Sequence, residues 1–137
     1  MNIVLDTNCL LMSVSRRSAY HAVWRGFVDG KYTLCLSNDI LSEYEEILSE
    51  KLGNVIASNI INAILDLPNT RMVQVYYHLH LVTQDPDDDK FVDCAFKSNA
   101  RYIVTQDHHF DILKKTGFPL IDIVGIDQFV SILKNEE

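Results

Sequence analysis

The sequence predicts an α/β fold: a three-layer α/β/α sandwich around a mostly parallel sheet of about five strands. Short apolar segments rich in β-branched residues alternate along the chain with helix-length segments of helical periodicity. This alternation calls for right-handed crossover connections, so that helices cover both faces of the sheet. The 137 residues include only five glycines and three prolines, and no linker marks a boundary. We therefore expect residues 1–137 to form a single domain.

Two kinds of segment make up this pattern. The strands are expected where a run is short, apolar and β-branched, which places them at 3–5, 33–36, 72–75, 102–104 and 120–124. The helices are expected where apolar residues follow the helical period, which places them at 20–28, 40–52, 55–65, 91–96 and 127–133. Ser37 can cap the second helix, while Gly30, Pro68 and Asn99 are stop signals that follow three of them.

The composition excludes several classes of protein. No apolar run approaches the ~20 residues that cross a bilayer, and the first residues lack the basic and apolar regions of a signal peptide. The three cysteines, Cys9, Cys35 and Cys94, have no zinc-type spacing and lie in hydrophobic stretches, so we expect reduced, buried thiols. These observations predict a cytoplasmic protein without a membrane span.

The charge balance limits how this protein could bind nucleic acid. It has 19 acidic and 12 basic side chains and a formal net charge of −7. A broad basic surface, which dominates many nucleic-acid complexes, is therefore not expected. If the partner is a polyanion, positive charge must come from another source.

Carboxylates follow two of the predicted strands at the point where each strand ends. Asp6 comes directly after 3–5, and Asp107 follows 102–104. In such sheets the chemistry lies beyond the carboxyl ends of the strands, where the strand order reverses. Glu43, one turn into the helix after 33–36, could reach the same edge. Asp89 and Asp93 are one helical turn apart and project on one side of the helix that leads to 102–104.

Converging carboxylates repel one another unless a cation neutralises them, and hard oxygen ligands suit Mg²⁺ or Mn²⁺. The alternative is that aspartates simply favour helix N-termini, and we prefer this interpretation for Asp85, Asp87 and Asp88. A solvated helix face is the better interpretation of Asp39, Glu45, Glu46 and Glu50. A calcium loop starting at Asp85 fails, because its sixth position is Lys90 rather than glycine.

Four motifs occur in register with this order of strands and helices. They are Asp6-Thr7-Asn8, Ser37-x-x-Ile40-Leu41-x-Glu43, Asp85-Pro86-Asp87-Asp88-Asp89-Lys90-Phe91-Val92-Asp93-Cys94-Ala95, and Tyr102-Ile103-Val104-Thr105-x-Asp107. Together they resemble the PIN domain family over nearly the whole chain. The resemblance is greatest to the branch that contains toxin components of bacterial toxin–antitoxin pairs.

The resemblance implies a metal-dependent ribonuclease with one or two Mg²⁺ or Mn²⁺ ions. The four family acids correspond to Asp6, Glu43, Asp89 and Asp107. Asp93 matches a further acid, and Asn8 and Thr105 match polar residues that hydrogen-bond the metal ligands. Helical periodicity does not choose between Glu43 and Glu45, but the family pattern chooses Glu43.

The resemblance also implies partners: an RNA substrate, an antitoxin protein and a second copy of the chain in a homodimer. The helix with Tyr20, Trp24 and Phe27 is a candidate dimer surface, although these aromatic residues could equally form core. Candidate contacts to flanking phosphates are Arg16, Arg17 and Lys90, which solubilisation of the surface explains almost as well.

The alternative functions are a housekeeping RNA-processing nuclease, a DNA flap nuclease and a non-catalytic RNA- or protein-binding module. The intact set of Asp6, Glu43, Asp89 and Asp107 argues against the non-catalytic module. An aspartyl phosphatase is disfavoured because Asn8 stands where its second aspartate would be. The pairs His78/His80 and His108/His109 could be imagined in a transition-metal site, but loop histidines are the better interpretation.

Overall fold

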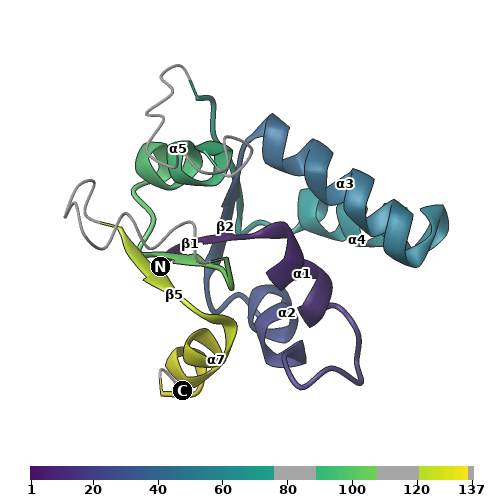
Figure 1. Ribbon diagram of the computed structural model, residues 1–137, viewed down its shortest axis with the longest axis horizontal. Helices are drawn as coiled ribbons and strands as arrows, with labels where there is room; N and C mark the ends of the chain where they lie inside the picture. Colours follow the sequence, from purple (N-terminus) through teal and green to yellow (C-terminus); the bar gives the residue numbers. More distant parts are fainter. Residues whose placement is uncertain (76–88, 108–120, 136–137) are drawn as a thin grey trace.

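The computed structural model describes residues 1–75, 89–107 and 121–135. Its centre is a five-stranded sheet in the order β3-β2-β1-β4-β5, and every pairing is parallel (Figure 1). The strands are β1 (Asn2–Leu5), β2 (Thr33–Leu36), β3 (Thr70–Met72), β4 (Tyr102–Val104) and β5 (Asp122–Val124). The predicted α/β class with a five-stranded sheet is therefore confirmed.

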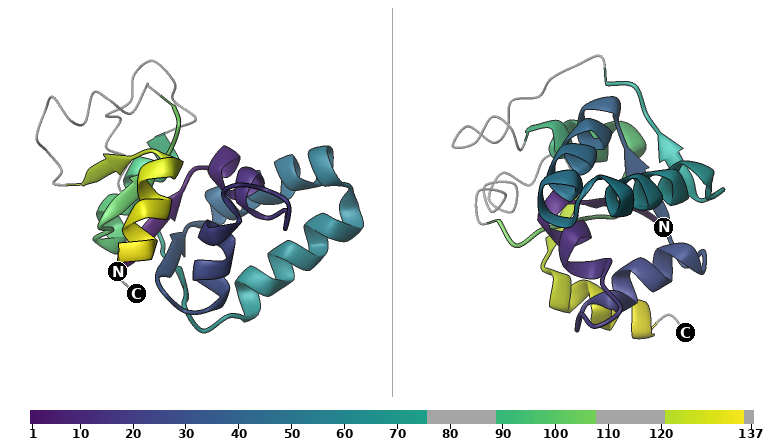
Figure 2. Two further views of the ribbon diagram at one scale, coloured as in Figure 1. Left: turned by 90° about the horizontal axis from the view of Figure 1, so that it is seen from below. Right: turned by 90° about the vertical axis from the view of Figure 1, so that its right-hand side faces the viewer.

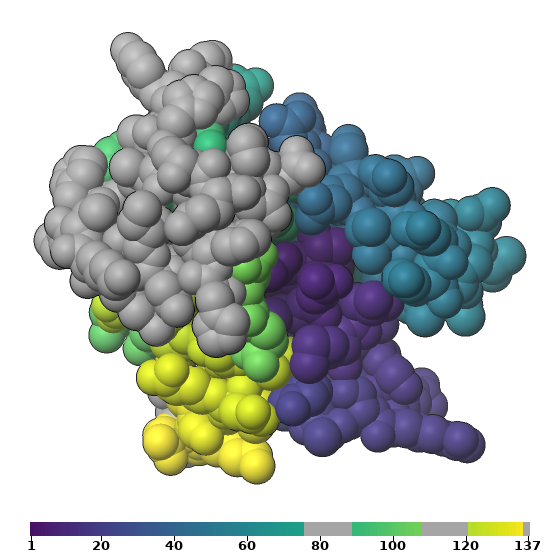
Figure 3. All heavy atoms as spheres, in the orientation of Figure 1, coloured from purple at the N-terminus to yellow at the C-terminus, as the bar shows by residue number. Residues whose placement is uncertain are grey.

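Six helices surround the sheet in the described part of the chain. They are α1 (Thr7–Ser13), α2 (His21–Val28), α3 (Asn38–Leu52), α4 (Asn54–Asp66), α5 (Asp89–Ser98) and α7 (Ile126–Asn135). Helix α5 packs on the central strands from one side, whereas α2 and α7 contact each other on the other side (Figures 1 and 2). Helices α3 and α4 form an antiparallel hairpin, which makes a lobe of its own beside α1 and α2 (Figure 3).

The central strands are completely buried, as strands covered on both faces must be. Ile3, Val4 and Leu34 are all 0% exposed. Helix α3 is anchored to the end of β1, because the buried Tyr44 hydroxyl donates a hydrogen bond to the Leu5 carbonyl at 2.6 Å. This bond holds α3 beside the carboxyl edge of the sheet.

The aromatic residues of α2 belong largely to the core. Phe27 is 1% exposed, and its ring lies 5.5 Å from that of Trp24 and 6.1 Å from that of Tyr32. This helix was interpreted either as a dimer surface or as part of the core, and the burial of Phe27 supports the core. The three cysteines are free and buried, as predicted. None of the described helices is long and apolar enough to cross a membrane.

Several boundaries differ from the prediction. The third strand is Thr70–Met72 rather than 72–75, because it is an edge strand with exposed side chains and hydropathy does not locate it. A short helix, Thr7–Ser13, begins directly after Asp6 and was not predicted. Helix α7 begins one residue early, at Ile126, and β5 begins at Asp122 rather than at 120. Residue 120 lies outside the described residues.

Candidate active site

Asp6 lies at the carboxyl end of β1, where the strand order reverses between β1 and β4. Its backbone N–H donates to the Val104 carbonyl at 3.0 Å, which ties the ends of these two strands together. The Thr105 hydroxyl donates to Asp6 Oδ2 at 2.7 Å, and the Asp107 N–H donates to the Thr105 oxygen at 2.9 Å. The residue after β4 thus orients the carboxylate that follows β1.

The electrostatics of Asp6 indicate that other acids are near. Burial raises the pKa of this carboxyl, which is only 7% exposed as a residue, while hydrogen bonds from Thr105 and from the Asn8 N–H lower it. The charges of Glu43 and Asp107 raise the pKa of Asp6 further. Carboxylates from β1, α3 and the end of β4 are therefore close enough to repel one another.

Glu43 is held at this edge from two sides. Ser37 caps α3 by accepting a hydrogen bond from the Ile40 N–H, so Glu43 lies in the second turn of a well-started helix. Its Oε2 accepts a hydrogen bond from the Thr7 hydroxyl, and its Oε1 pairs with Lys90 Nζ at 2.8 Å. Glu45, the alternative on the same helix, is exposed.

The sequence did not reveal the role of Thr7. Thr7 is the middle residue of Asp6-Thr7-Asn8 and the first residue of the unpredicted helix α1. Recognition of that helix would have placed a hydroxyl beside the carboxyl edge. The Asn8 side chain is exposed, and its described contribution to Asp6 is through the backbone N–H.

Asp89 and Asp93 both lie on α5 and are 8% and 3% exposed. Because Lys90 contacts Glu43, the first turn of α5 is tied to α3 and hence to this edge. Arg16 and Arg17 are exposed in the connection between α1 and α2. The predicted histidine pairs and Asp85, Asp87 and Asp88 lie outside the described residues.

The donor set fits a hard divalent cation in its chemistry, because it consists of carboxylate oxygens whose mutual repulsion a cation would relieve. Within the described ranges, however, no three acidic, histidine or cysteine side chains are placed so that they could hold one ion together. The Lys90 ammonium, rather than an acidic neighbour, lies against Glu43.

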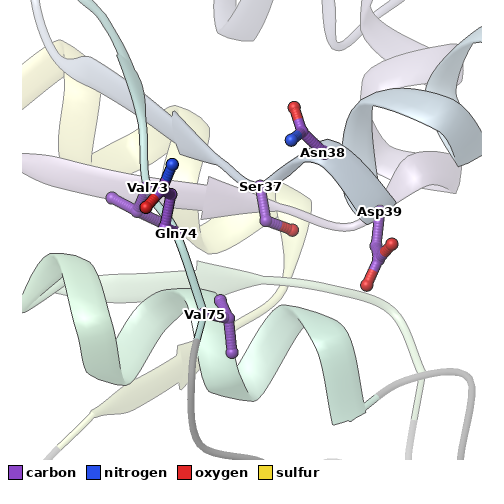
Figure 4. A pocket seen from close by; sticks show the side chains of 6 residues that line it. All are labelled: Ser37, Asn38, Asp39, Val73, Gln74 and Val75. Atoms are coloured by element: carbon purple, nitrogen blue, oxygen red, sulfur yellow. The ribbon is translucent and has the colours of Figure 1, made fainter.

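A pocket of about 370 Å³ lies where the chain leaves β2 and β3, at the same edge of the sheet. One wall is the start of α3 and the other is the chain that continues from β3 (Figure 4). Its described lining residues are Ser37, Asn38, Asp39, Val73, Gln74 and Val75. The pocket therefore offers amide, hydroxyl and carboxylate groups beside apolar side chains. Its lining residues on the α3 side precede Glu43 by four residues or more.

Comparison with known proteins agrees with this arrangement. Residues 2–109 match the family model of the PIN domain. The chain belongs to the PIN domain family. The family match spans the segments that carry Asp6, Glu43, Asp89 and Asp107. None of the curated proteins compared matches this PIN domain.

Two solved structures share the fold of this PIN domain. A chain of VapBC2 from Rickettsia felis, in a complex bound to a DNA fragment from its promoter, has a TM-score of 0.61 and 15% identity, covering 91% of this chain and 98% of that one. VapC20 from Mycobacterium tuberculosis, a sarcin–ricin loop cleaving toxin, has a TM-score of 0.57 and 18% identity, covering 85% and 95%. At these identities the likeness establishes the fold.

Proposed function

We propose that this PIN domain is a metal-dependent endoribonuclease and the toxin of a toxin–antitoxin pair. One observation carries the proposal: carboxylates from three separate elements meet at the switch point of the sheet, so that the charges of Glu43 and Asp107 raise the pKa of Asp6. A group of like charges around the buried Asp6 is unfavourable for folding, and a cation-dependent reaction would give this group a function. Residues 1–137 act as one domain in this proposal.

The residues of the site have different roles in this proposal. Asp6, Glu43, Asp89, Asp93 and Asp107 would hold Mg²⁺ or Mn²⁺. When bound, the cation would supply a nucleophilic water at neutral pH and offset charge on the phosphodiester, and it would also give an acidic protein the positive charge it needs for RNA. Thr105 and the Asn8 N–H keep Asp6 in position, and Arg16 and Arg17 contact flanking phosphates.

The structural neighbours support the choice of substrate and partner. VapC20 is described as a toxin that cleaves the sarcin–ricin loop, which favours RNA over DNA for this chain. An antitoxin protein is the proposed partner, in line with the shared fold of the VapBC2 chain. A homodimer and a cytoplasmic location complete the proposal, and the buried free thiols suit a reducing compartment.

The test is a cleavage assay on a structured RNA and a single-stranded DNA of the same sequence, with Mn²⁺, Mg²⁺ and EDTA arms. Asp89→Asn and Asp107→Asn each remove one charge at nearly constant size, so cleavage of RNA should fall by orders of magnitude while the protein stays folded. Asp122→Asn is the matched control, because Asp122 is exposed at the opposite edge of the sheet.

The outcomes separate the alternatives. Cleavage that persists in EDTA, or that Asp89→Asn leaves intact, would contradict the metal-dependent mechanism. Cleavage of DNA but not RNA would move the substrate to that of a flap nuclease. Absence of any cleavage by wild type in the presence of either metal would leave a binding module as the better description.

A further inference from the structure

Both carboxylate oxygens of Glu43 are engaged by side chains from other elements. Oε2 accepts from the hydroxyl of Thr7, the first residue of α1, and Oε1 lies 2.8 Å from Nζ of Lys90, the second residue of α5. Thr7 directly follows Asp6, and Lys90 directly follows Asp89. The contacts to Glu43 therefore join the three elements that carry these acids.

This ion pair is more enclosed than a surface ion pair. The Lys90 and Glu43 side chains are 19% and 27% exposed, against 60% and 61% for Arg101 and Asp122. Solvent and salt screen the enclosed pair less, so its attraction is stronger. Its Glu43 member also faces Asp6, whose pKa it raises, and the Lys90 charge offsets part of that negative charge.

A divalent cation and the Lys90 ammonium would compete for the same carboxylate. Both are drawn to Glu43 Oε1, and they repel each other at short range. Within the described ranges the acids do not form a ready set of ligands for an ion, and a lysine holds Glu43. The Lys90 ammonium thus lies against the carboxylate that a bound cation would need as a ligand.

We propose that Lys90 is a positioning residue that holds Glu43 in the metal-free protein and releases it when a divalent cation binds, so that the Lys90–Glu43 pair sets the affinity for the cation. The inference rests on the metal site of the proposed function. It assigns to Lys90 a role at Glu43 in addition to the phosphate contact that the sequence suggested. In the metal-free protein, the positive charge of Lys90 reduces the repulsion among the acids, so the chain can fold before a cation binds.

The experiment is a calorimetric titration of Mn²⁺ into the metal-free protein, with no RNA present. Lys90→Gln keeps a hydrogen-bond donor but removes the charge, and it should bind Mn²⁺ about tenfold more tightly, which corresponds to about 1.4 kcal/mol. Lys90→Arg keeps the charge and should stay close to wild type. Lys51→Gln, an exposed lysine in the last turn of α3, is the control and should leave the affinity unchanged.

A second measurement follows the metal-free state itself. Thermal unfolding in EDTA should show Lys90→Gln less stable than wild type, and the difference should disappear when Glu43→Gln is present in both proteins. Such coupling would support the pair without any metal or RNA. An unchanged melting temperature in Lys90→Gln would count against it.

The proposal is overturned if Lys90→Gln binds Mn²⁺ no more tightly than wild type, including the case in which neither binds. It is also overturned if the Gln and Arg variants shift together, because the charge would then not be responsible. A chain that shows the expected Mn²⁺ affinities but leaves RNA intact would refute the ribonuclease and keep this inference. Asp89-dependent cleavage of RNA with an unchanged Mn²⁺ affinity in Lys90→Gln would do the opposite.

Discussion

The amino and carboxyl edges of the sheet are formed by the two ends of the same strands, but their charged residues are arranged differently. At the amino edge, Arg101 pairs with Asp122 at 3.0 Å in solvent, and each charge has an exposed partner of opposite sign. At the carboxyl edge, the buried Asp6 faces the like charges of Glu43 and Asp107. Parallel strands bring their carboxyl ends together at a switch point, which makes this edge the place for a group of like charges. The amino edge thus holds a solvent-exposed pair of opposite charges, whereas the carboxyl edge holds like charges around a buried carboxylate.

The largest expected effect is that of Asp6→Asn. This variant removes a buried charge that its neighbours repel, so RNA cleavage should fall by orders of magnitude while the melting temperature in EDTA rises. Asp122→Asn, at the amino edge, should change neither quantity appreciably. Cleavage at the wild-type rate by Asp6→Asn would remove the chemical difference between the two edges.

Metal addition should stabilise the carboxyl edge alone. Urea unfolding of wild type at a Mn²⁺ concentration of about 100 times the dissociation constant should show a gain of about 2.7 kcal/mol, which EDTA reverses. Asp122→Asn should gain as much, whereas Glu43→Gln should gain less because one ligand oxygen has lost its charge. An equal gain in Glu43→Gln would exclude Glu43 from the metal site.

The support beneath Asp6 is tested by Tyr44→Phe. The Tyr44 hydroxyl, 0% exposed, donates to the carbonyl of Leu5, the residue before Asp6. Its removal leaves a buried carbonyl without this donor and should lower the free energy of unfolding by about 1–3 kcal/mol. Tyr102→Phe, at the first residue of β4, is the matched control and should stay within about 0.5 kcal/mol of wild type.

The pKa values of two cysteines depend on the charges near each thiol. Burial, followed by the charge of Asp6, raises the pKa of Cys9 to about 12. Burial also raises the pKa of Cys35, but a hydrogen bond with Ser98 and then the positive charges of Arg71 and the N-terminal ammonium lower it. Thiolate absorbance of single-cysteine variants should therefore appear at lower pH for Cys35 than for Cys9. If Cys9 titrated at lower pH than Cys35, the causes assigned to the two pKa shifts would be wrong.

The sign of the stability effect follows from the same shifts. The folded protein holds the Cys9 proton more tightly than the unfolded chain, whose ordinary pKa is 9.0. The contribution to stability is thus fully present below pH 9 and is lost as the pH rises toward 12. Unfolding measured across that range should show a decline that is smaller in Cys9→Ala, where Cys94, whose pKa burial also raises to about 12, still contributes.

The smallest effect is expected at the amino edge. Arg101→Ala removes an exposed ion pair and a contact with the Tyr102 ring, whose centroid lies 4.9 Å from the guanidinium. Because both charges are in solvent, unfolding by urea should show a loss below about 1 kcal/mol. A larger loss would mean that the amino edge also depends on electrostatics.

The sequence was informative where burial is complete. The segments 33–36 and 102–104, which are buried except at their first residues, were predicted with their observed bounds, because helices cover both faces and leave a continuous apolar run. The edge strand β3 was displaced, since its exposed side chains carry no such pattern. Helix α1 was missed because it is seven residues long and begins without a side-chain cap.

In the candidate site, too, some features could be predicted from the sequence and others could not. The ends of the predicted strands placed Asp6 and Asp107 at one edge of the sheet. The family resemblance implied that Thr105 hydrogen-bonds one of the acids, and the structure shows that the acid is Asp6. The partners of Glu43 were beyond reach of the sequence, because Thr7 and Lys90 come from helices 36 and 47 residues away along the chain. Such contacts depend on how helices are set against one another, which periodicity does not encode.

The central position of β1 has a consequence for the order of events during synthesis. Asp6 is made early, but its hydrogen-bond partner Thr105 follows 99 residues later. At about 5–20 residues per second, the ribosome needs roughly 5–20 s to cover that distance. Until then β1 has only β2 beside it, because β4 has not yet been made. A chain that stops before β4 contains Asp6, Glu43, Asp89 and Asp93 but lacks Thr105 and Asp107. Its Asp6 therefore has neither the hydroxyl that orients it nor the neighbouring charge of Asp107.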